Sequence, residues 1–255
     1  MLTHVPPPNS DGQSSAKTTL PQSNALDALE CIGAPRSFAR DEEIYAEADV
    51  SDNWYRVASG TVRISKLLLD GRRHIAEFCF AGDCFGLDSG SQRVFSAEAV
   101  GEVALLRYSL RATERLIEED PRLARCLCAM TLRELARSRG RMLLLGRMTA
   151  SERVASFLLE MSKRRDQQSV FDLPMSRVDI ADYLGLTVET VCRTLSAFKR
   201  TGSITVPNPH RVEVCDREAL KAIAEGETCP TQPQPTMMLR DLRLPASPRA
   251  SISFA

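Results

Sequence analysis

The chain has 255 residues, of which 43% are hydrophobic and 26% are charged, and its 33 basic residues balance 33 acidic residues. This length favours two modest domains, and the composition excludes a wholly disordered, collagen-like or coiled-coil protein. Because the net charge is zero, any binding to nucleic acid must come from a local patch. Every apolar run is far shorter than the roughly 18 residues that a membrane span needs, so the sequence predicts a soluble protein without a membrane partner.

The two ends of the chain are rich in proline. Residues 1–21 hold four of the 14 prolines, and residues 230–248 hold five more. Such segments cannot form a core by themselves, so we expect disorder over 1–25 and over 227–255. The first segment also lacks the cationic and apolar regions of a signal peptide, which predicts a cytoplasmic location. The eight cysteines are therefore expected to be free thiols.

A β domain is predicted within residues 26–110. Between Ile44 and Tyr108, short apolar pieces are separated by glycines, which is typical of β hairpins. Apolar and polar residues alternate along these pieces, so each strand has one buried face. The Asp70-Gly71 pair predicts a two-residue type I′ hairpin turn. A small antiparallel barrel or sandwich follows from this pattern.

Residues 111–147 are predicted to form a long helical stretch, broken near Pro121. Its apolar residues fall into two groups on different sides of the helix. The first group, which we assign to dimerisation, is Leu116, Leu123, Leu127 and Met130. The second group is Leu132, Leu135, Met142 and Leu145. A helix that packs only on its own β domain needs one stripe, so a second stripe favours a parallel dimer; a wide stripe buried within one subunit is the alternative.

Residues 148–226 are predicted to form a DNA-binding domain that contains a helix-turn-helix. Ser176 is a good N-cap for the first helix of this motif. Ala181, Gly185 and Val191 then occupy the three diagnostic positions. The alanine lets the two helices approach closely, the glycine allows a left-handed turn, and the branched residue fills the gap between the helices.

The second helix of this motif presents three residues for reading DNA bases. Glu189, Cys192 and Arg193 lie at positions i, i+3 and i+4, so they share one face near the helix N-terminus. Arg193 can form two hydrogen bonds with guanine, and Glu189 can accept one from cytosine. The alternative is an ordinary surface ion pair between Glu189 and Arg193, but the helix-turn-helix spacing around them favours base readout.

Residues 203–214 are predicted to form a hairpin that looks like the wing of a winged helix. Basic residues gather around this hairpin and around the end of the preceding helix, where they could hold phosphates. The residues expected to contact the DNA backbone are Arg177, Thr187, Thr190, Lys199, Arg200, His210 and Arg211. As a charge run alone, this group would indicate only a solvated surface.

These motifs resemble the Crp/Fnr family of bacterial regulators. The resemblance rests on Arg177, on DIADYLGLT at 179–187 and on the Glu-Thr-Val-x-Arg set at 189–193, and the order of the parts matches over about residues 26–225. The segments LLLDGRRHIAEFCFAGDCFG and MLLLGRMTASERVASFLL are most similar to the FixK branch. The resemblance implies an α+β fold with an N-terminal β-roll like the cyclic-nucleotide-binding jelly roll, a long dimerisation helix and a C-terminal winged helix-turn-helix.

The resemblance also implies a function. Members with this Glu-x-x-x-Arg set read a palindrome with TTGA-type half-sites, so Glu189 and Arg193 would be the base readers of a homodimer on double-stranded DNA. Activation through contact with RNA polymerase is the usual mode of the family, and the FixK branch implies control of genes for low-oxygen respiration or nitrogen metabolism. Cys192 stands where Fnr-like members usually have serine, which leaves its contact open and makes it a candidate redox site.

The effector chemistry departs from that of some relatives. Members that bind cyclic AMP carry an Arg-Ser pair after the glycine-rich turn, but here Ser96 follows Phe95. Without a cation at that place a cyclic phosphate would be poorly held, so we expect no cyclic AMP. The cysteines also lack the spacing of a metal or iron–sulfur site. The sequence therefore predicts no cofactor and no metal.

Two alternatives stay open at this point. The first is a ligand-sensing or thiol-redox-sensing member of the same family. The second is a cyclic-nucleotide-regulated enzyme in which the helix-turn-helix is incidental. An enzyme is disfavoured because the sequence contains no Ser/His/Asp, paired-carboxylate or phosphate-loop constellation and has three histidines. We therefore expect a regulator without catalytic activity.

Overall fold

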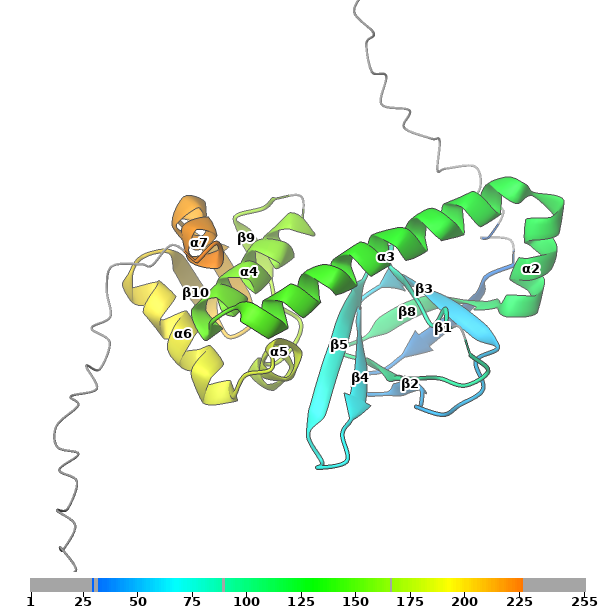
Figure 1. Cartoon of the computed structure of the whole chain (residues 1–255), viewed down its shortest axis with the longest axis horizontal. Coiled ribbons are helices and arrows are strands. Elements are labelled where there is room, and N and C mark those ends of the chain that lie inside the picture. The colour runs from blue at the N-terminus through cyan, green and yellow to red at the C-terminus, as the bar shows by residue number, and fades with distance from the viewer. Residues whose placement is uncertain (1–28, 30–31, 89, 166, 227–255) are drawn as a thin grey trace, which may run out of the picture.

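The computed structural model describes residues 29, 32–88, 90–165 and 167–226. The two segments predicted to be disordered, 1–25 and 227–255, lie outside the described residues. Figure 1 shows a β domain and a smaller, mainly helical C-terminal domain, and a long helix runs across the β domain toward the C-terminal domain. This arrangement confirms the predicted α+β fold.

The β domain consists of two four-stranded antiparallel sheets that face each other across an apolar core. The first sheet has the order β1 (Ala34–Phe38), β8 (Val103–Ser109), β3 (Asn53–Ser59) and β6 (Cys84–Phe85). The second sheet has the order β2 (Glu43–Tyr45), β7 (Ser96–Ala99), β4 (Thr61–Leu67) and β5 (Arg73–Phe80).

The β4–β5 hairpin turns differently from the prediction. Only Gly71 has a positive φ, +81°, whereas a type I′ turn would need positive φ at Asp70 as well. The Gly71 N–H donates to the Leu68 carbonyl, and the Leu68 N–H donates to the Arg72 carbonyl. The connection is therefore a longer loop in which a turn is followed by a left-handed glycine, so the prediction of a two-residue turn was wrong.

The helical stretch is divided at the expected place. The two helices are α2 (Leu110–Glu119) and α3 (Pro121–Arg147). Asp120 separates them with an extended backbone, and its carboxylate accepts a hydrogen bond from the Arg122 N–H. Pro121 stands at the first position of α3, where its missing N–H costs nothing.

The four residues assigned to dimerisation face the β domain of their own chain. Leu123 is fully buried in a cluster with Trp54 and Tyr108, and Leu116 and Leu127 pack against this cluster. Met130 lines a cavity between α3 and the β domain. The prediction that these residues form a dimer interface was therefore wrong. Helical periodicity predicts an apolar stripe, but it does not show which neighbour covers it.

A different set of apolar side chains on α3 is open. Leu132, Leu135, Met142 and Leu143 have exposed fractions of 60%, 44%, 72% and 70%. Three of these four belong to the second group that the sequence indicated. Leu145, the remaining member of that group, is partly buried. The second face of α3 is therefore uncovered within one copy of the chain.

The C-terminal domain combines helices with a small sheet. Its helices are α4 (Ala150–Lys163), α5 (Arg177–Leu184), α6 (Val188–Arg200) and α7 (Arg217–Ala224). Its antiparallel sheet has the order β10 (Ile204–Asn208), β11 (Arg211–Val214) and β9 (Val170–Asp172). The β10–β11 hairpin is the wing that the sequence predicted. Within the described ranges, no helix is both long enough and apolar enough to cross a membrane.

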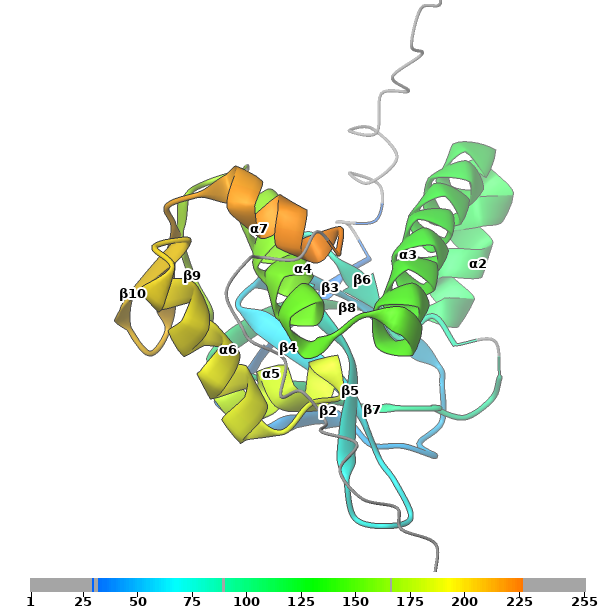
Figure 2. The ribbon, with the colours of Figure 1, turned by 60° about the vertical axis from the view of Figure 1, so that its left-hand side comes forward.

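The cores of the two domains meet. Ile75, Phe78 and Val100 of the β domain belong to the same buried cluster as the apolar residues of the C-terminal domain. The rings of Phe78 and Tyr183 lie 5.2 Å apart between their centroids. Figures 1 and 2 show α5 beside β5 in both views. One apolar interior therefore fixes the C-terminal domain on the β domain.

Candidate nucleic-acid interface

Local sequence signals build the helix-turn-helix at the expected positions. The Ser176 hydroxyl accepts a hydrogen bond from the Asp179 N–H, and the Asp179 carboxylate accepts one from the Ser176 N–H, so α5 begins with a capping box. Gly185 ends α5 with a left-handed φ of +63°. Ala181 and Val191 are buried between α5 and α6. These features confirm the predicted motif and fix the direction in which α6 leaves the turn.

The three predicted base readers lie together on α6. Thr187 caps this helix by accepting from the Thr190 N–H at 3.2 Å. Glu189, Cys192 and Arg193 are all exposed on the face opposite the buried residues of the helix. The helix N-terminus adds a partial positive charge at this end, which suits an approach to DNA.

Arg193 is free to turn toward a ligand. Its Nη2 atom donates a long hydrogen bond of 3.4 Å to the Thr190 hydroxyl. No ion pair with Glu189 occurs among the described residues, so the alternative of a surface ion pair has no support in this structure. The guanidinium fork therefore keeps donors available for a partner that approaches from outside.

The predicted phosphate contacts fall into two separate groups. Thr187, Thr190, His210 and Arg211 lie near the start of α6 and on the wing. Lys199 and Arg200 lie in the last turn of the 13-residue helix α6, which places them about 15 Å from its first turn. Both basic residues are exposed. They would therefore contact a different stretch of DNA backbone from Thr187 and Thr190.

Arg177 has a structural contact that the sequence did not indicate. Its Nη2 atom donates to the Pro209 carbonyl in the wing at 3.0 Å, whereas its Nη1 atom is buried and has no hydrogen-bond partner. Burial lowers the pKa of this guanidinium, and the neighbouring Cys192 acts in the opposite direction. Arg177 thus joins α5 to the wing beside Cys192, and its contact with a phosphate stays a prediction.

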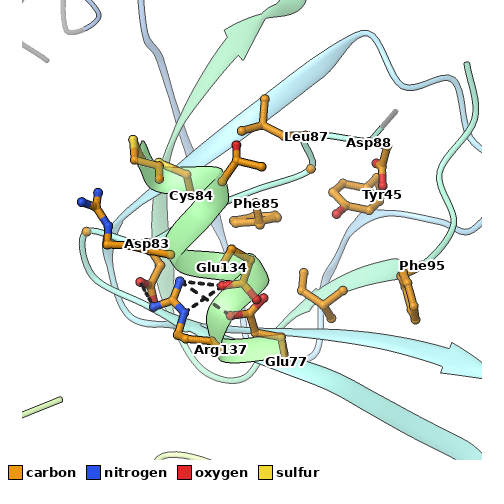
Figure 3. A pocket seen from close by; sticks show the side chains of 16 residues that line it. Tyr45, Glu77, Asp83, Cys84, Phe85, Leu87, Asp88, Phe95, Glu134 and Arg137 are labelled. Carbon is orange, nitrogen blue, oxygen red and sulfur yellow. Dashed lines mark hydrogen bonds and ion pairs between the residues drawn. The ribbon is translucent and has the colours of Figure 1, made fainter. Parts of the chain in front are cut away.

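A cavity of about 260 Å³ lies between the β domain and α3. Figure 3 shows aromatic rings of Tyr45, Phe85 and Phe95 on its sides and two carboxylates, Glu77 and Glu134, pointing toward each other. Asp83 and Asp88 add further carboxylates to the lining. Arg133 and Arg137 also line the cavity, so carboxylates and guanidinium groups are mixed there.

The structure places a buried cation, Arg93, near the glycine-rich turn, and the sequence did not predict it. The Arg93 guanidinium lies 4.2 Å from the centre of the Tyr45 ring, and its side chain is 2% exposed. Its Nη1 atom donates to the Gly86 carbonyl at 2.7 Å and to Asp88 at 2.8 Å, and its Nη2 atom donates to the Asn53 carbonyl. The expectation that no cation lies here was wrong, but groups of the same chain already use these donors.

The two facing carboxyl groups differ in their partners. Glu134 accepts hydrogen bonds from Arg137 and from Arg141, both at 2.8 Å. The Arg141 guanidinium lies 3.7 Å from Glu77, and the Glu77 Oε1 atom is buried without a hydrogen-bond partner. Burial, aided by the charge of Glu134, raises the pKa of Glu77 to about 8. Glu77 therefore carries a proton near neutral pH, whereas Glu134 is ionised.

The thiols of the β domain are poor nucleophiles, because burial keeps them protonated. Burial raises the pKa of Cys84 to about 12 and raises the pKa of Cys79 well above its usual value. Cys192 is exposed, as are Cys128 and Cys215. In the described part of the chain these cysteines are free and no group of side chains has the composition of a metal site.

Comparison with known proteins identifies both domains. Residues 152–223 match the family model of the Crp-like helix-turn-helix domain, which covers α5, α6 and the wing. Residues 35–120 match the model of the cyclic nucleotide-binding domain. The two models thus recognise the same two parts that the geometry separates.

Relatives of the whole arrangement are known. The nitrogen fixation regulation protein FixK of Azorhizobium caulinodans is 46% identical over 75% of this chain and 79% of its own length. The FixK protein of Bradyrhizobium diazoefficiens is 40% identical over 72% of this chain and 81% of its own length. The solved structure of FixK2 from Bradyrhizobium japonicum superimposes with a TM-score of 0.72 at 42% identity, and covers 75% of this chain and 97% of that one. The chain therefore belongs to the Crp/Fnr family of DNA-binding transcription regulators, and within it to the FixK branch.

Proposed function

We propose that this protein is a homodimeric transcription activator that reads a palindrome with TTGA-type half-sites. The observation that carries the proposal is the exposed face of α6, where Glu189, Cys192 and Arg193 stand together at the start of a capped helix. A helix presented in this way fits the major groove of DNA.

The chemistry of two of these side chains suits the proposed half-site. The Arg193 guanidinium matches the O6 and N7 acceptors of guanine, and Glu189 matches the amino group of cytosine on the opposite strand. Within the described part of the chain, Arg193 is held by the weak contact with Thr190 alone, so little has to be broken before it reaches a base. The proposal assigns sequence reading to these side chains and anchoring to the wing and the last turn of α6.

The proposal of a homodimer rests on α3. Two recognition helices can read both halves of a palindrome only when they lie about 34 Å apart, one turn of DNA. The exposed apolar face of α3, formed by Leu132, Leu135, Met142 and Leu143, is the surface that a second copy would cover. Pairing along this face leaves the contacts between α3 and its own β domain intact.

The names of the relatives support a biological role. The relatives from Azorhizobium and Bradyrhizobium are nitrogen fixation regulators, and the FnrL protein of Cereibacter sphaeroides, 33% identical over 76% of this chain and 82% of its own length, is a transcriptional activator. We propose that this chain likewise activates genes of nitrogen or low-oxygen metabolism, with RNA polymerase as its partner.

Binding to a TTGA palindrome tests the proposed function. Arg193→Ala should weaken binding of the full-length protein by about 5- to 150-fold for each half-site, because one bidentate contact contributes about 1–3 kcal/mol. Fluorescence anisotropy at a fixed salt concentration measures the effect. Arg200→Ala is the matched control, since a lost phosphate contact should weaken binding to the palindrome and to a scrambled duplex equally. Equal affinity of Arg193→Ala and wild type for the palindrome would refute the assignment.

A further inference from the structure

The β domain holds the first helix of the helix-turn-helix through one arginine. Arg73 stands at the start of β5, and its guanidinium reaches α5. Its Nη2 atom donates to Asp179 Oδ1 at 2.6 Å, and its Nε atom donates to Asp182 Oδ2 at 2.8 Å. The two bonds join residues more than 100 positions apart in the sequence. We call Arg73, Asp179 and Asp182 the interdomain clasp.

Asp179 divides its two oxygens between two tasks. Its Oδ2 atom accepts from the Ser176 N–H and hydroxyl in the capping box, whereas its Oδ1 atom accepts from Arg73. A second arginine of the β domain, Arg63, lies 3.6 Å from the same Oδ1 atom. Asp179 is only 4% exposed, so water replaces these partners poorly. The group that starts α5 is therefore also the group that fastens it to the β domain.

An apolar contact beside the clasp restricts the direction of α5. The Tyr183 ring on α5 packs against Phe78 of β5, with 5.2 Å between the centroids, and against Phe157 of α4, with 5.9 Å. Asp179 lies in the first turn of this eight-residue helix, whereas Asp182 and Tyr183 are adjacent and lie one turn later. Two separated contacts prevent rotation, which one contact alone would allow.

We propose that Arg73 is a positioning residue for DNA recognition, which sets the angle of the helix-turn-helix on the β domain although it contacts α5 and not the reading helix α6. This proposal rests on the proposed function, since it concerns the reading of a palindrome by two copies. The two reading helices must enter the groove at a fixed separation. If the C-terminal domain of either copy can rotate on its β domain, the affinity for the palindrome therefore falls. Such rotation has little effect on binding to a single half-site, because only one reading helix is then used.

The test uses a swap of charges across the clasp. Arg73→Asp and Asp182→Arg, each alone, place like charges against each other and should lower the affinity for the palindrome about tenfold, a usual size for coupling between sites. The double variant Arg73→Asp/Asp182→Arg restores opposite charges between positions 73 and 182 but leaves a carboxylate at position 73 against Asp179, so it should recover part of the loss. Affinity for a duplex with one half-site should change less than twofold in all three variants. Fluorescence anisotropy with the full-length protein measures both affinities at one salt concentration.

A neighbouring residue supplies the matched control. Arg72 carries the same charge, but it pairs with Asp70 at 2.7 Å on the exposed hairpin loop, away from α5. Arg72→Asp should therefore leave the affinity for the palindrome unchanged. Arg73→Gln is a milder variant for the case that a reversed charge prevents folding, and circular dichroism melting reports the folding of every variant.

The outcomes separate this inference from the proposed function. If the wild type does not prefer the palindrome to a scrambled duplex, the proposed function fails. If the wild type prefers it and the folded Arg73 variants bind equally well, the clasp does not position the reading helix. Tighter binding by the folded Arg73 variants also overturns the inference.

Discussion

Cys192 is the residue on the reading face whose chemistry differs most from its neighbours. Its thiol is exposed beside Glu189 and Arg193, and the partly buried Arg177 lies near it with one unpaired donor atom. Peroxide converts a thiol to a sulfenic acid with release of water, and a second equivalent gives a sulfinic acid with a negative charge. A negative group at this place would repel the phosphates that border the groove.

We predict that peroxide weakens DNA binding through this thiol. Wild type treated with hydrogen peroxide should lose affinity for the palindrome, whereas Cys192→Ser should bind when untreated and should keep its affinity after treatment. Anisotropy titrations before and after oxidation measure the difference, and mass spectrometry locates the added oxygen. Cys215→Ser, which removes another exposed thiol, is the control and should remain as sensitive as the wild type. An equal loss in the wild type and in Cys192→Ser would assign the effect to another thiol.

The residues that sequence reasoning found are those whose role depends on near neighbours. Ser176, Gly185 and Thr187 act through hydrogen bonds or backbone angles within a few positions, so the sequence contains the whole signal for the motif. Arg93 and Arg73 act through partners that the fold brings from distant positions. Local sequence patterns do not indicate such contacts, so the sequence did not predict the roles of these two arginines.

The helix α3 has two apolar sides with different neighbours. One side is buried on the β domain around Leu123, and the other side exposes Leu132 and Met142. The spacing of leucines along the helix predicts both stripes, but it does not reveal which stripe meets the chain's own β domain. That choice depends on the position of Trp54 and Tyr108, which is a property of the assembled fold.

Substitutions on the two sides of α3 should have different effects. Leu132→Glu combined with Met142→Glu should give folded monomers, because both side chains are exposed and only a second copy would cover them. Leu123→Glu should instead unfold the β domain, since it places a charge in an apolar core that water does not reach. Analytical ultracentrifugation and circular dichroism distinguish the two results.

A control and a contrary outcome complete this test. Arg125→Glu, at an exposed polar position of the same helix, should leave the protein dimeric. If the Leu132→Glu/Met142→Glu variant stays dimeric at micromolar concentration, α3 is not the dimer interface. Monomers of this variant should also lose binding to the palindrome while they keep weak binding to a half-site.

For the molecule as a whole, pH acts at the junction of the β domain and α3. The raised pKa of Glu77, about 8 against a usual 4.5, means that the folded protein keeps a proton that the unfolded chain releases. The free energy of unfolding should therefore fall as pH rises from about 4.5 to about 8 and then level off. Burial disfavours the charged form of Glu134, but hydrogen bonds with Arg141 and Glu77 and the charge of Arg137 outweigh it and lower the pKa of this carboxyl. Glu134 therefore affects stability only on the acid side of this range.

We predict that Glu77→Gln removes this part of the pH dependence. As pH rises, the free energy of unfolding of the wild type should fall by at most about 1.4 kcal/mol for each pH unit relative to that of the variant. The fall should be smaller because the remaining exposure of Glu77 lets water share the charge. Urea unfolding at several values between pH 5 and pH 8.5 measures the difference. Glu160→Gln, which removes a carboxylate bound to Arg164, is the control and should follow the wild type. Parallel curves for wild type and Glu77→Gln would contradict the prediction.

The shared interior of the two domains constrains how the molecule unfolds and how it can be recombined. Ile75, Phe78 and Val100 are interior residues only while the C-terminal domain covers them, so neither half is complete alone. Heating should then produce one cooperative transition for both halves rather than two independent ones. A chimera that takes only the DNA-binding half from another regulator would leave these side chains against a surface shaped for different partners. We therefore expect exchange of DNA specificity between such proteins to succeed more readily at the exposed face of α6 than at the boundary between the halves.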